Sequence, residues 1–465
     1  MLDYFFHPNG VAIIGATDSQ LKGGFHLVRN ALAGYKGTLY PVNPKYTEIL
    51  GVPCYPGIES IPGNFDMAVY FIPAKFLPET IMACSQKGVK GIIIQSAGFS
   101  EVGPEGKKLQ EDSVALARKL GIRLWGPNCM GYLDGHSRNV FSFMYSDKWT
   151  TLMQPGNVSL IVQSGMLSAG FLLMMLDRGG IGMSKVCSIG NKCDVHETEL
   201  LEYLINDVNT GVIGCYLESI IDGRKFLDLA RSTDKPVIVL KSGRSDSGAK
   251  AAMSHTASLS GEAAVYTGAF RQAGITQVYD MHELMDMVRG FSKTGTYRPR
   301  GKTAVVTFSG GAGIVTADLL EDRGLGLADL SADTMAAIKE VFPPWMEPSH
   351  PVDLWPAVEQ NGASRVYNAA VEAVLKDPGV DSLIIETFAW SFGKSDFFGP
   401  LGALKKKYNK PVAVWQVGSN PQFDEFRIAA ENAGLPVFEE IGRCAAFLDA
   451  VKQYYGRREK LKAGT

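Results

Sequence analysis

One pattern occurs three times along this chain and constrains its fold more than any other feature. A short apolar run leads into a turn of small residues and then into a helical pattern, and these runs begin at Gly10, Gly156 and Gly301. About 145 residues separate each start from the next. Further apolar runs alternate with amphipathic stretches, which is typical of parallel strands covered by helices on both faces. The sequence therefore predicts three doubly wound α/β domains.

Domain boundaries are expected where this periodicity lapses. Residues 132–154 are polar and aromatic without helical spacing, and residues 292–301 are rich in Gly, Pro and basic side chains, as linkers are. We place the domains at residues 1–133, 150–290 and 300–458. A strand followed by glycine is common in α/β proteins, so the regular spacing does not establish an internal duplication.

Composition narrows the classes of partner. The 465 residues are 46% hydrophobic and 20% charged, with a formal net charge of −2, so no charge excess favours nucleic acid or an anionic membrane. The most apolar stretch, residues 166–176, is shorter than the roughly 20 residues that span a bilayer. The first residues lack the basic and apolar regions of a secretory signal. We expect a cytoplasmic protein without nucleic acid or membrane partners.

The cysteines and histidines give no sign of a metal site. Seven cysteines form an odd set without a C-x-x-C pair, which argues against a disulfide framework and against a zinc ribbon. No two histidines stand at metal-ligand spacing. We expect reduced, largely buried thiols and no metal bound by this chain.

The turn of the first domain suits a phosphate better than a nicotinamide nucleotide. Ligands of doubly wound sheets bind at the carboxyl ends of strands, where helix N-termini offer free amides. The turn that starts at Gly15 is not G-x-G-x-x-G, and the second strand ends in Asn43, Pro44 and Lys45 instead of an acidic residue. Taken alone, Lys45 is better explained as a solvated surface lysine. Residues 243–250 lack the Lys-Ser/Thr end of a P-loop.

The corresponding turn of the second domain is a second candidate anion site. Gln163, Ser164 and Gly165 open an apolar helix that continues from Met166. Backbone amides and the Ser164 hydroxyl would suit an anion. An ordinary helix cap explains the same serine, and sequence position alone does not choose between these roles.

A segment rich in Ser, Ala and Gly follows the fourth apolar run of the second domain. Residues 244–261 contain few large apolar side chains, which predicts weak packing, and one titratable ring, His255, lies among them. For a lone histidine, a structural role is the simpler interpretation.

This segment resembles a known family. Residues 241–261 are similar to the phosphohistidine loop of the NDP-forming acyl-CoA synthetases, the ADP-forming acetate–CoA ligase group related to succinyl-CoA synthetase. The resemblance extends over essentially the whole chain. Its ordered motifs are residues 11–19, 42–45, 71–76, 96–103, 126–131, 163–165, 188–197, 216–219, 308–314 and 351–354.

The resemblance implies a fold and a set of site residues. The first domain would be a Rossmann-like CoA-binding domain, and the second and third would be flavodoxin-like. His255 matches the phosphorylated histidine and Glu218 the glutamate that orients its ring. The implied phosphate-binding residues are Gln163, Ser164, Gly165 and Met166. The implied CoA-binding residues are Gly15, Ala16, Thr17, Asp18, Ser19, Lys45, Pro73, Lys75 and Asn128.

Two positions depart from the family pattern. The family often has an acidic residue where this chain has His196, and alanine where it has Cys193. Both lie in the motif at residues 188–197, close to the implied active loop.

The resemblance also implies a reaction and a partner. Acyl-CoA, NDP and phosphate would be interconverted with acid, CoA and NTP through an acyl phosphate and phosphohistidine. The family binds ADP or ATP and Mg²⁺ on an ATP-grasp unit, whereas the three domains account for this whole chain. It would therefore be an alpha subunit that needs a beta subunit, in an α2β2 assembly. Two alternatives stay open: a CoA-binding transferase or lyase with a structural His255, and a non-catalytic CoA-sensing module.

Overall fold

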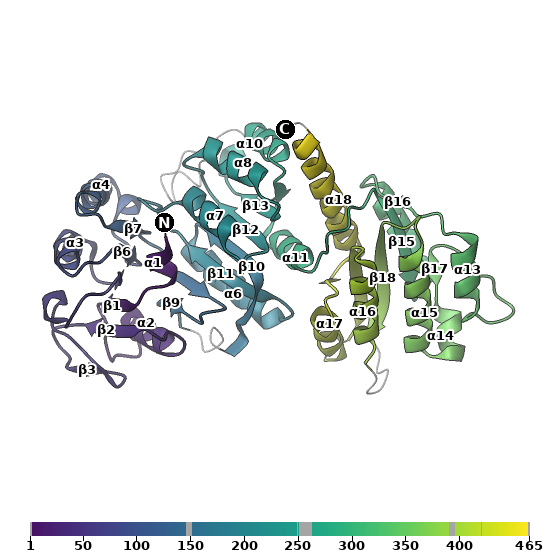
Figure 1. Ribbon diagram of the computed structural model, residues 1–465, viewed down its shortest axis with the longest axis horizontal. Helices are drawn as coiled ribbons and strands as arrows, with labels where there is room; N and C mark the ends of the chain where they lie inside the picture. The colour runs from purple at the N-terminus through teal and green to yellow at the C-terminus, as the bar shows by residue number, and fades with distance from the viewer. Residues whose placement is uncertain are drawn as a thin grey trace. The chain divides into compact units, whose positions relative to one another are not determined.

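The computed structural model divides the chain into two compact units (Figure 1). It describes residues 2–145, 151–248, 250, 263–389, 396–419 and 421–463. The first unit comprises Met1–Asp177 and Ile181–Met281, and the second comprises Arg178–Gly180 and His282–Thr465. Two large sheets belong to the first unit and one to the second.

The first sheet consists of five parallel strands in the order β2-β1-β5-β6-β7. The strands are β1 (Gly10–Ile14), β2 (Thr38–Val42), β5 (Met67–Tyr70), β6 (Gly91–Ile94) and β7 (Arg123–Trp125). Its helices are α1 (Asp3–Phe6), α2 (Gly23–Leu32), α3 (Leu77–Gln86) and α4 (Pro104–Lys119). Smaller elements are the hairpin β3 (Glu48–Ile49) and β4 (Val52–Pro53) and the short helices η1 (Ile58–Ser60), η2 (Ala74–Phe76) and η3 (Ser100–Val102).

The second sheet has seven strands in the order β14-β13-β12-β10-β11-β8-β9. The parallel strands are β10 (Gln154–Val162), β11 (Gly182–Ser188), β12 (Val212–Leu217), β13 (Val237–Lys241) and β14 (Thr276–Val278). Its helices are α6 (Gly165–Arg178), α7 (Glu197–Asn206), α8 (Gly223–Ser232) and α10 (Ala263–Gln272).

Two short strands extend this sheet from a stretch where we expected only an irregular connector. β8 (Tyr132–Asp134) pairs antiparallel with β11, and β9 (Val140–Phe141) pairs antiparallel with β8. Strands of three and two residues are too short to give a periodic hydrophobic signal. The second sheet is therefore mixed rather than wholly parallel, and the exact domain boundaries stay a prediction.

The third sheet lies in the second unit and has the order β16-β15-β18-β19-β20, with β17 also paired to β15. Its strands are β15 (Lys302–Thr307), β16 (Gly326–Leu327), β17 (Val352–Asp353), β18 (Ser382–Ala389), β19 (Val412–Gly418) and β20 (Val437–Phe438). The helices of this unit are α11 (Met281–Ser292), α12 (Gly310–Glu321), α13 (Ala332–Lys339), α14 (Trp355–Asn361), α15 (Ala363–Lys376), α16 (Phe398–Tyr408), α17 (Gln422–Asn432) and α18 (Ile441–Ala463).

The three sheets share one strand order. When the parallel strands of each sheet are numbered along the chain, with β17 set aside, all three read 2-1-3-4-5. The order reverses between the first and third strands, at β1/β5, β10/β12 and β15/β18. Doubly wound sheets bind ligands at this switch point. The three α/β domains predicted from the recurring pattern are confirmed.

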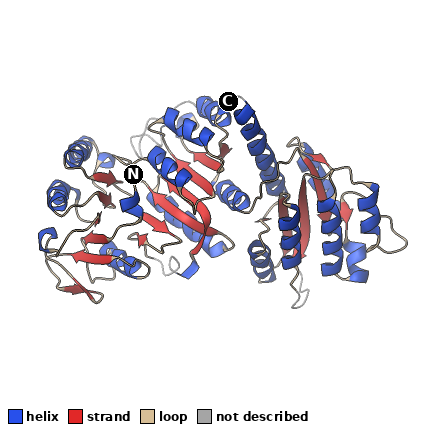
Figure 2. Cartoon of the chain, in the orientation of Figure 1, coloured by secondary structure: helices blue, strands red, loops and turns tan. Residues whose placement is uncertain are grey.

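Continuous burial of the strands explains the apolar runs in the sequence. Every residue of β1, β5, β6 and β13 is buried, as expected for parallel strands with helices on both faces (Figure 2). In the first unit one apolar core includes Ile13 of β1 and Ile161 of β10. Trp125 joins the two sheets, because its indole N–H donates to the Ser188 carbonyl oxygen at 2.7 Å.

Helix α11 belongs to the second unit by its contacts. Arg289 is buried and pairs with Asp286 at 2.7 Å and with Glu431. Arg443 of α18 also pairs with Asp286 at 2.7 Å. The Phe291 ring packs edge-on against the Phe447 ring. These contacts fix α11 to α17 and α18 of the second unit.

The cysteines match their expectation. None of the seven is paired in a disulfide, and all are buried except Cys193, which is half-buried. Burial raises the pKa of the thiols of Cys187 and Cys215, so these thiols stay protonated and unreactive at neutral pH.

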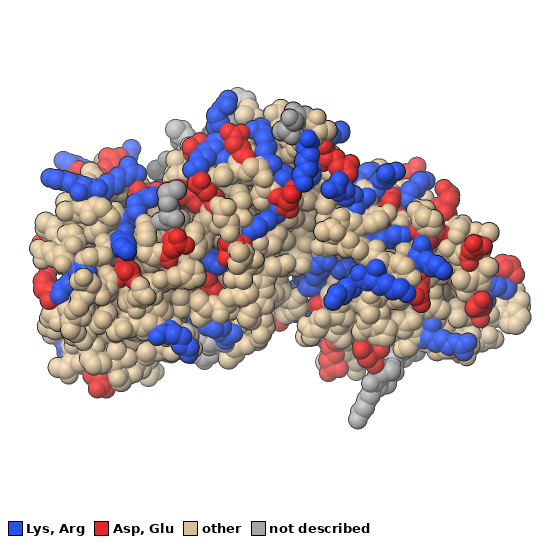
Figure 3. Space-filling model, in the orientation of Figure 1, with Lys and Arg blue, Asp and Glu red and all other residues tan. Residues whose placement is uncertain are grey.

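The surface carries both signs of charge. Acidic and basic side chains lie side by side over the face shown in Figure 3, in keeping with the net charge of −2. Within the described ranges, every helix is too short or too polar to cross a membrane.

Candidate functional site

The turn after β1 fits only glycine at its first position. Gly15 has φ +95°, and a Cβ there would lie 2.5 Å from the Phe71 carbonyl oxygen. A Cβ on Gly24 would lie 2.1 Å from the Gly15 carbonyl oxygen. The start of α2 thus packs directly against the turn, which holds its backbone at the first switch point.

This turn is hydrogen-bonded to the residues that follow β2. The Asn43 amide donates to the Ala16 carbonyl oxygen at 2.7 Å, and the hydroxyls of Thr17 and Tyr46 lie 3.1 Å apart. The Lys45 amide donates to the Asn43 side chain at 3.0 Å. The predicted CoA-binding residues at positions 15–19 and Lys45 are therefore brought together.

A cavity of about 250 Å³ lies beside this turn. Gly15, Asn43, Pro44, Ile72 and Thr80 are among the residues that line it. Its apolar walls and nearby backbone amides have the character of small-molecule sites.

The other predicted CoA-binding residues lie along the same sheet edge. The Ser96 hydroxyl donates to the Ile72 carbonyl oxygen at 2.7 Å, and the Asn128 amide donates to the Ser96 carbonyl oxygen at 3.0 Å. Pro73 and Asn128 are thus linked through the ends of β5, β6 and β7. Lys75 is exposed on η2, and its ammonium lies 5.0 Å from the centre of the Phe76 ring. The contacts do not bring Lys75 to Lys45.

The carboxyl edges of the first and second sheets meet through two loops. A Cβ on Gly190 would lie 2.1 Å from the Pro127 carbonyl oxygen, which accepts a hydrogen bond from the Asn191 amide at 2.9 Å. A Cβ on Gly165, at the start of α6, would lie 3.7 Å from the Met130 side chain. The loop at residues 126–131 therefore connects the edge that bears Asn128 to the start of α6.

The predicted phosphate residues stand at the second switch point. α6 begins at Gly165, directly after the half-buried Ser164. The first amides of a helix have no partner within the helix and carry partial positive charge. These N–H groups and the serine hydroxyl are the groups expected to bind phosphate, and that role stays a prediction. The Met166 side chain lies outside the described part of the structure.

Gln163 has a further task that the sequence did not reveal. Its side-chain oxygen accepts hydrogen bonds from the amides of Glu218, at 2.8 Å, and Ser219, at 3.3 Å. Gln163 is 3% exposed. It therefore ties the end of β10 to the end of β12, across the switch point.

Lys192, in the loop after β11, also contacts the segment formed by Glu218 and Ser219. Its ammonium donates to the Ser219 carbonyl oxygen at 2.8 Å and to the Ser219 hydroxyl at 3.0 Å, and it pairs with Glu197 at 3.0 Å. Burial lowers the pKa of Lys192, although Glu197 opposes this effect. The sequence analysis did not single out this lysine.

Lys241, the last residue of β13, contacts the Glu218–Ser219 segment from the other side of β12. Its ammonium donates to the carbonyl oxygens of Glu218, at 2.7 Å, and Ser242, at 2.6 Å, and lies 4.7 Å from the centre of the Tyr266 ring. Burial and then the charge of Lys192 lower the pKa of Lys241 to about 8, against the opposing effect of Glu218.

The Glu218 side chain is 4% exposed and also contacts Tyr216. Tyr216 makes side-chain hydrogen bonds with Glu218 and Ser242, and burial raises the pKa of its hydroxyl. His255 lies outside the described residues. The structure thus places Glu218 at the second switch point, and the predicted pairing of Glu218 with His255 stays a prediction.

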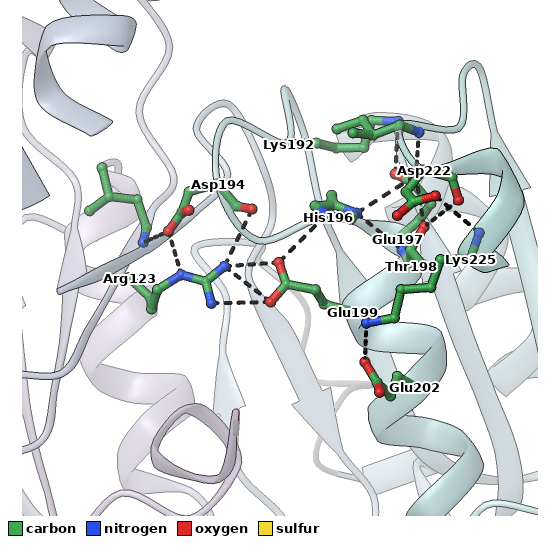
Figure 4. A network of polar contacts seen from close by, with 12 residues as sticks. Arg123, Lys192, Asp194, His196, Glu197, Thr198, Glu199, Glu202, Asp222 and Lys225 are labelled. Atoms are coloured by element: carbon green, nitrogen blue, oxygen red, sulfur yellow. Dashed lines mark hydrogen bonds and ion pairs between the residues drawn. The ribbon is translucent and has the colours of Figure 1, made fainter. Parts of the chain in front are cut away.

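A polar network joins the first sheet to the loop before α7 (Figure 4). Asp194 pairs with Arg123 at 2.7 Å and with Arg118 at 2.9 Å, and it accepts the Leu124 amide at 3.0 Å. Burial alone would raise the pKa of Asp194, but these hydrogen bonds outweigh it and lower the pKa. Arg123 also binds Glu199 at 2.8 Å. The network fastens β7 and α4 to α7.

The two departures from the family pattern belong to this fastening region. His196 is the N-cap of α7, where its Nδ1 accepts the Thr198 amide at 3.4 Å, and its Nε2 lies 3.6 Å from Glu199. Side-chain oxygens of Ser, Thr, Asp or Asn usually fill such caps, and here the ring nitrogen of His196 accepts the amide in their place. Cys193 packs against the core of the first sheet.

The third switch point has a different chemical character. The Thr307 hydroxyl accepts the Ser309 amide at 3.0 Å, and α12 follows at once. Glu386 is 0% exposed inside β18 and is hydrogen-bonded to Thr316 and Thr307. Burial raises the pKa of Glu386 despite these hydrogen bonds. The sequence analysis assigned no role to these residues.

Three family patterns match successive parts of the chain. Residues 9–134 match the family described as CoA binding domain. Residues 155–291 match the succinyl-CoA ligase like flavodoxin domain, and residues 303–393 match the ligase-CoA domain. The matches follow the three sheets.

Relatives that align with nearly the whole chain indicate the same family. The chain is 39% identical to the ADP-forming acetate–CoA ligase II of Archaeoglobus fulgidus, over 97% of this chain and 67% of that protein. It is 37% identical to the alpha subunit of the ADP-forming acetate–CoA ligase II of Pyrococcus furiosus, over 97% of this chain and 98% of that subunit. A solved structure of acetyl-coenzyme A synthetase 1 from Candidatus Korarchaeum cryptofilum, in complex with phosphate and ADP, matches with a TM-score of 0.89 and 32% identity, covering 100% of this chain and 99% of that one. The chain therefore belongs to the family of ADP-forming acetate–CoA ligases, and its extent matches the alpha subunit.

Proposed function

We propose that this chain is the catalytic alpha subunit of an acyl-CoA synthetase that interconverts acyl-CoA, NDP and phosphate with acid, CoA and NTP. The observation that carries the proposal is the second switch point. There the N-terminus of α6 and the buried Glu218 lie at one sheet edge, and the loop at residues 126–131 joins this edge to the predicted CoA-binding edge. An anion cradle, a carboxylate and a CoA-binding fold suit phosphoryl transfer from an acyl phosphate.

The reaction is divided into steps because a carboxylate has no good leaving group. A phosphate oxygen attacks the thioester carbonyl, the C–S bond breaks, and CoA leaves as a thiolate that takes up a proton. A nitrogen of His255 then attacks phosphorus in the acyl phosphate, and the carboxylate leaves. The terminal oxygen of NDP finally takes the phosphoryl group from the histidine.

Each predicted residue has a physical role in these steps. The amides at Ser164 and Gly165 offset phosphate charge, as helix N-termini do by about 1 kcal/mol. Glu218 holds the imidazole of His255 in one tautomer and stabilises its positive charge. The Gly15 turn and Lys45 bind the phosphates of CoA, and Pro73 and Asn128 contact its adenine and pantetheine parts.

The nucleotide belongs on a partner chain. The A. fulgidus relative extends well beyond the part that aligns with this chain, whereas the P. furiosus alpha subunit is covered almost completely. This difference supports a separate ATP-grasp beta subunit, in an α2β2 complex, that binds ADP or ATP with Mg²⁺. We place the complex in the cytoplasm.

Labelling of the chain tests this function. The complex with its partner subunit is incubated with ATP labelled in the γ-phosphate, and we expect acid-labile label on this chain in the wild type and none in His255→Asn. Label retained in His255→Asn would exclude the phosphohistidine route. A transferase or lyase would turn over CoA esters without label, and a CoA-sensing module would bind CoA with neither turnover nor label.

Reconstitution tests whether ATP formation needs a separate partner subunit. We expect the isolated chain to bind CoA in calorimetry but to form no ATP from acetyl-CoA, ADP and phosphate until the partner is added. Robust ATP synthesis by the pure chain alone would overturn the proposed partner.

A further inference from the structure

The Glu218–Ser219 segment is held at every main-chain polar group by three side chains. We call Gln163, Lys192 and Lys241 the Glu218 clamp. Both amides of the segment donate to Gln163. Its two carbonyl oxygens accept from Lys241 and Lys192 in turn. The clamp thus joins the ends of β10, β11 and β13 to the end of β12.

The two lysines of the clamp differ in how their charge is compensated. Lys192 has Glu197 at 3.0 Å. Lys241 is 1% exposed, and in the described part of the chain no carboxylate lies within ion-pair distance of its ammonium. Its ammonium relies on two carbonyl oxygens and the face of Tyr266. Burial of a charge without a counterion is unfavourable.

The two carbonyl groups that Lys241 binds lie at significant positions. One belongs to Glu218 itself, and the other belongs to Ser242, where the chain leaves β13 toward His255. Tyr216 bonds to the side chains of the same two residues. Lys241 therefore sets the spacing between the residue that orients the imidazole and the start of the segment that carries it.

We propose that Lys241 is a positioning residue for phosphoryl transfer, whose ammonium holds Glu218 and Ser242 at the separation that the reaction requires. This inference rests on the proposed function. It deepens that function by adding a residue that acts through Glu218 rather than on the substrate.

The charge of Lys241 gives the proposal a pH dependence. With its pKa lowered to about 8, the ammonium loses its proton as the pH rises above that value, and its hydrogen bonds to the two carbonyl oxygens lose their charge assistance. Among the described residues, the charged and titratable groups around it include Lys192, Glu197, Glu218, Tyr216 and Tyr266. Turnover is therefore expected to fall above about pH 8.

The contribution of Lys241 to the free energy of unfolding changes with pH in the opposite direction to turnover. The folded state holds this proton less tightly than the unfolded state, whose lysine keeps its ordinary pKa of about 10.4. Between the two values the unfolded state binds more protons, so this lysine makes the fold more stable as the pH rises. A loss of activity above about pH 8 that arises from Lys241 is thus separable from unfolding.

Lys235, which lies two residues before the same strand, provides a matched control. It precedes β13, and its ammonium also donates to two carbonyl oxygens, those of Leu204 at 3.0 Å and Asp207 at 2.6 Å. Burial lowers its pKa as well. Lys235 lies at the opposite end of the strand from the switch point, so it shares the bonding of Lys241 but not its position.

The experiment compares Lys241→Met, Lys241→Arg and Lys235→Met in the complex with the partner subunit. We measure the rate of chain labelling from γ-labelled ATP, and kcat and KM for CoA, between about pH 6.5 and pH 9.5, a range that brackets the value for Lys241. For Lys241→Met we expect kcat to fall about 10- to 100-fold, with KM for CoA nearly unchanged and the loss above pH 8 abolished. Lys241→Arg should recover part of kcat and keep it at high pH, because its guanidinium stays charged.

The outcomes separate this inference from the proposed function. Lys235→Met should keep the wild-type kcat and pH profile. If Lys241→Met retains wild-type labelling and the same decline above pH 8, Lys241 is not a positioning residue, even though His255→Asn has lost its label. If His255→Asn keeps its label, the proposed function itself fails. A circular dichroism spectrum and unfolding midpoint for each variant identify any that do not fold, and Lys241→Arg then decides through its pH profile.

Discussion

The second and third switch points have the same architecture and different chemistry. In both, a serine two residues after the first parallel strand is followed by a glycine that begins a helix, Ser164 before α6 and Ser309 before α12. In both, a buried glutamate lies near the end of the third parallel strand. Glu218 follows β12, where Gln163 and Lys241 hold its backbone, whereas Glu386 lies within β18, bonded to two threonines.

The comparison shows how a shift of a few positions along a strand changes what a carboxyl group can do. Inside the sheet, burial raises the pKa of Glu386 and favours its neutral form. At the strand end, the main-chain carbonyl oxygen of Glu218 accepts a hydrogen bond from the Lys241 ammonium, and its side chain is hydrogen-bonded to Tyr216. Strand order gives a place for a site, but the residues at the strand ends decide whether chemistry occurs there.

The largest expected effect tests this contrast directly. Glu218→Gln removes the carboxylate that we propose orients His255, and we expect labelling and kcat to fall by about 100-fold or more. Glu386→Gln replaces a buried carboxyl group, whose pKa is raised by burial, by an amide of similar shape, so kcat should stay within about twofold and the free energy of unfolding within about 1 kcal/mol. Equal losses of kcat in the two variants would erase the distinction between the switch points.

Removal of a buried glutamine gives the next effect. Gln163→Leu leaves two main-chain amides without their acceptor, and we expect the free energy of unfolding to fall by about 2 kcal/mol and kcat about tenfold. In the third sheet, Gln416 is also buried and donates to the Phe423 carbonyl oxygen. Gln416→Leu should lower stability with kcat unchanged. Chemical denaturation and steady-state kinetics report the two quantities.

The polar network around Asp194, in the loop before α7, is expected to contribute to stability rather than to catalysis. Asp194→Asn weakens the pairs with Arg118 and Arg123, and because these arginines are partly exposed we expect a loss of about 2 kcal/mol. The lowered pKa of Asp194 stabilises the fold above the ordinary carboxyl value near 3.9, and this contribution disappears as the pH falls through the folded pKa. Asp194→Asn should therefore make the free energy of unfolding less dependent on pH in the acid range. The midpoints of denaturant unfolding at each pH measure this dependence. A wild-type pH dependence in the variant would contradict this role.

The smallest effect is expected at His196, four residues after Lys192. His196→Ala removes the cap of α7 and should lower the free energy of unfolding by about 1 kcal/mol, with KM and kcat within twofold of wild type. A tenfold change in kcat at constant stability would move His196 from the fastening network into the reaction.

Much of the fold was predictable because buried parallel strands are recorded directly in the sequence. The three recurring turns mark the first strand of each sheet, and all three lie at switch points. The short strands β8 and β9 gave no periodic signal. The assignment of α11 to the second unit depends on Arg289 and Glu431, which are 142 residues apart.

The site was predictable in part, and the missing part has a physical cause. Glycines, Ser164 and Glu218 stand in recognisable motifs. Lys192 and Lys241 also lie within resembling segments, residues 188–197 and 241–261, but their sequence context predicts no role for them, because a lysine beside a turn is usually solvated. Their burial follows from carbonyl groups that converge only when four strands are assembled. A lysine that ends an otherwise apolar strand, as Lys241 does, was the one available signal.

The close approach of Gly190 to Pro127 has a consequence for protein engineering. No side chain larger than hydrogen fits at position 190 between these two loops. The turn at residues 188–193 and the turn at residues 126–131 therefore have complementary shapes. A chimaera that grafts the amino-terminal third of another family member onto this chain should keep both turns from a single parent. Exchange of either one alone would force these two loops apart, next to the proposed CoA and phosphate sites.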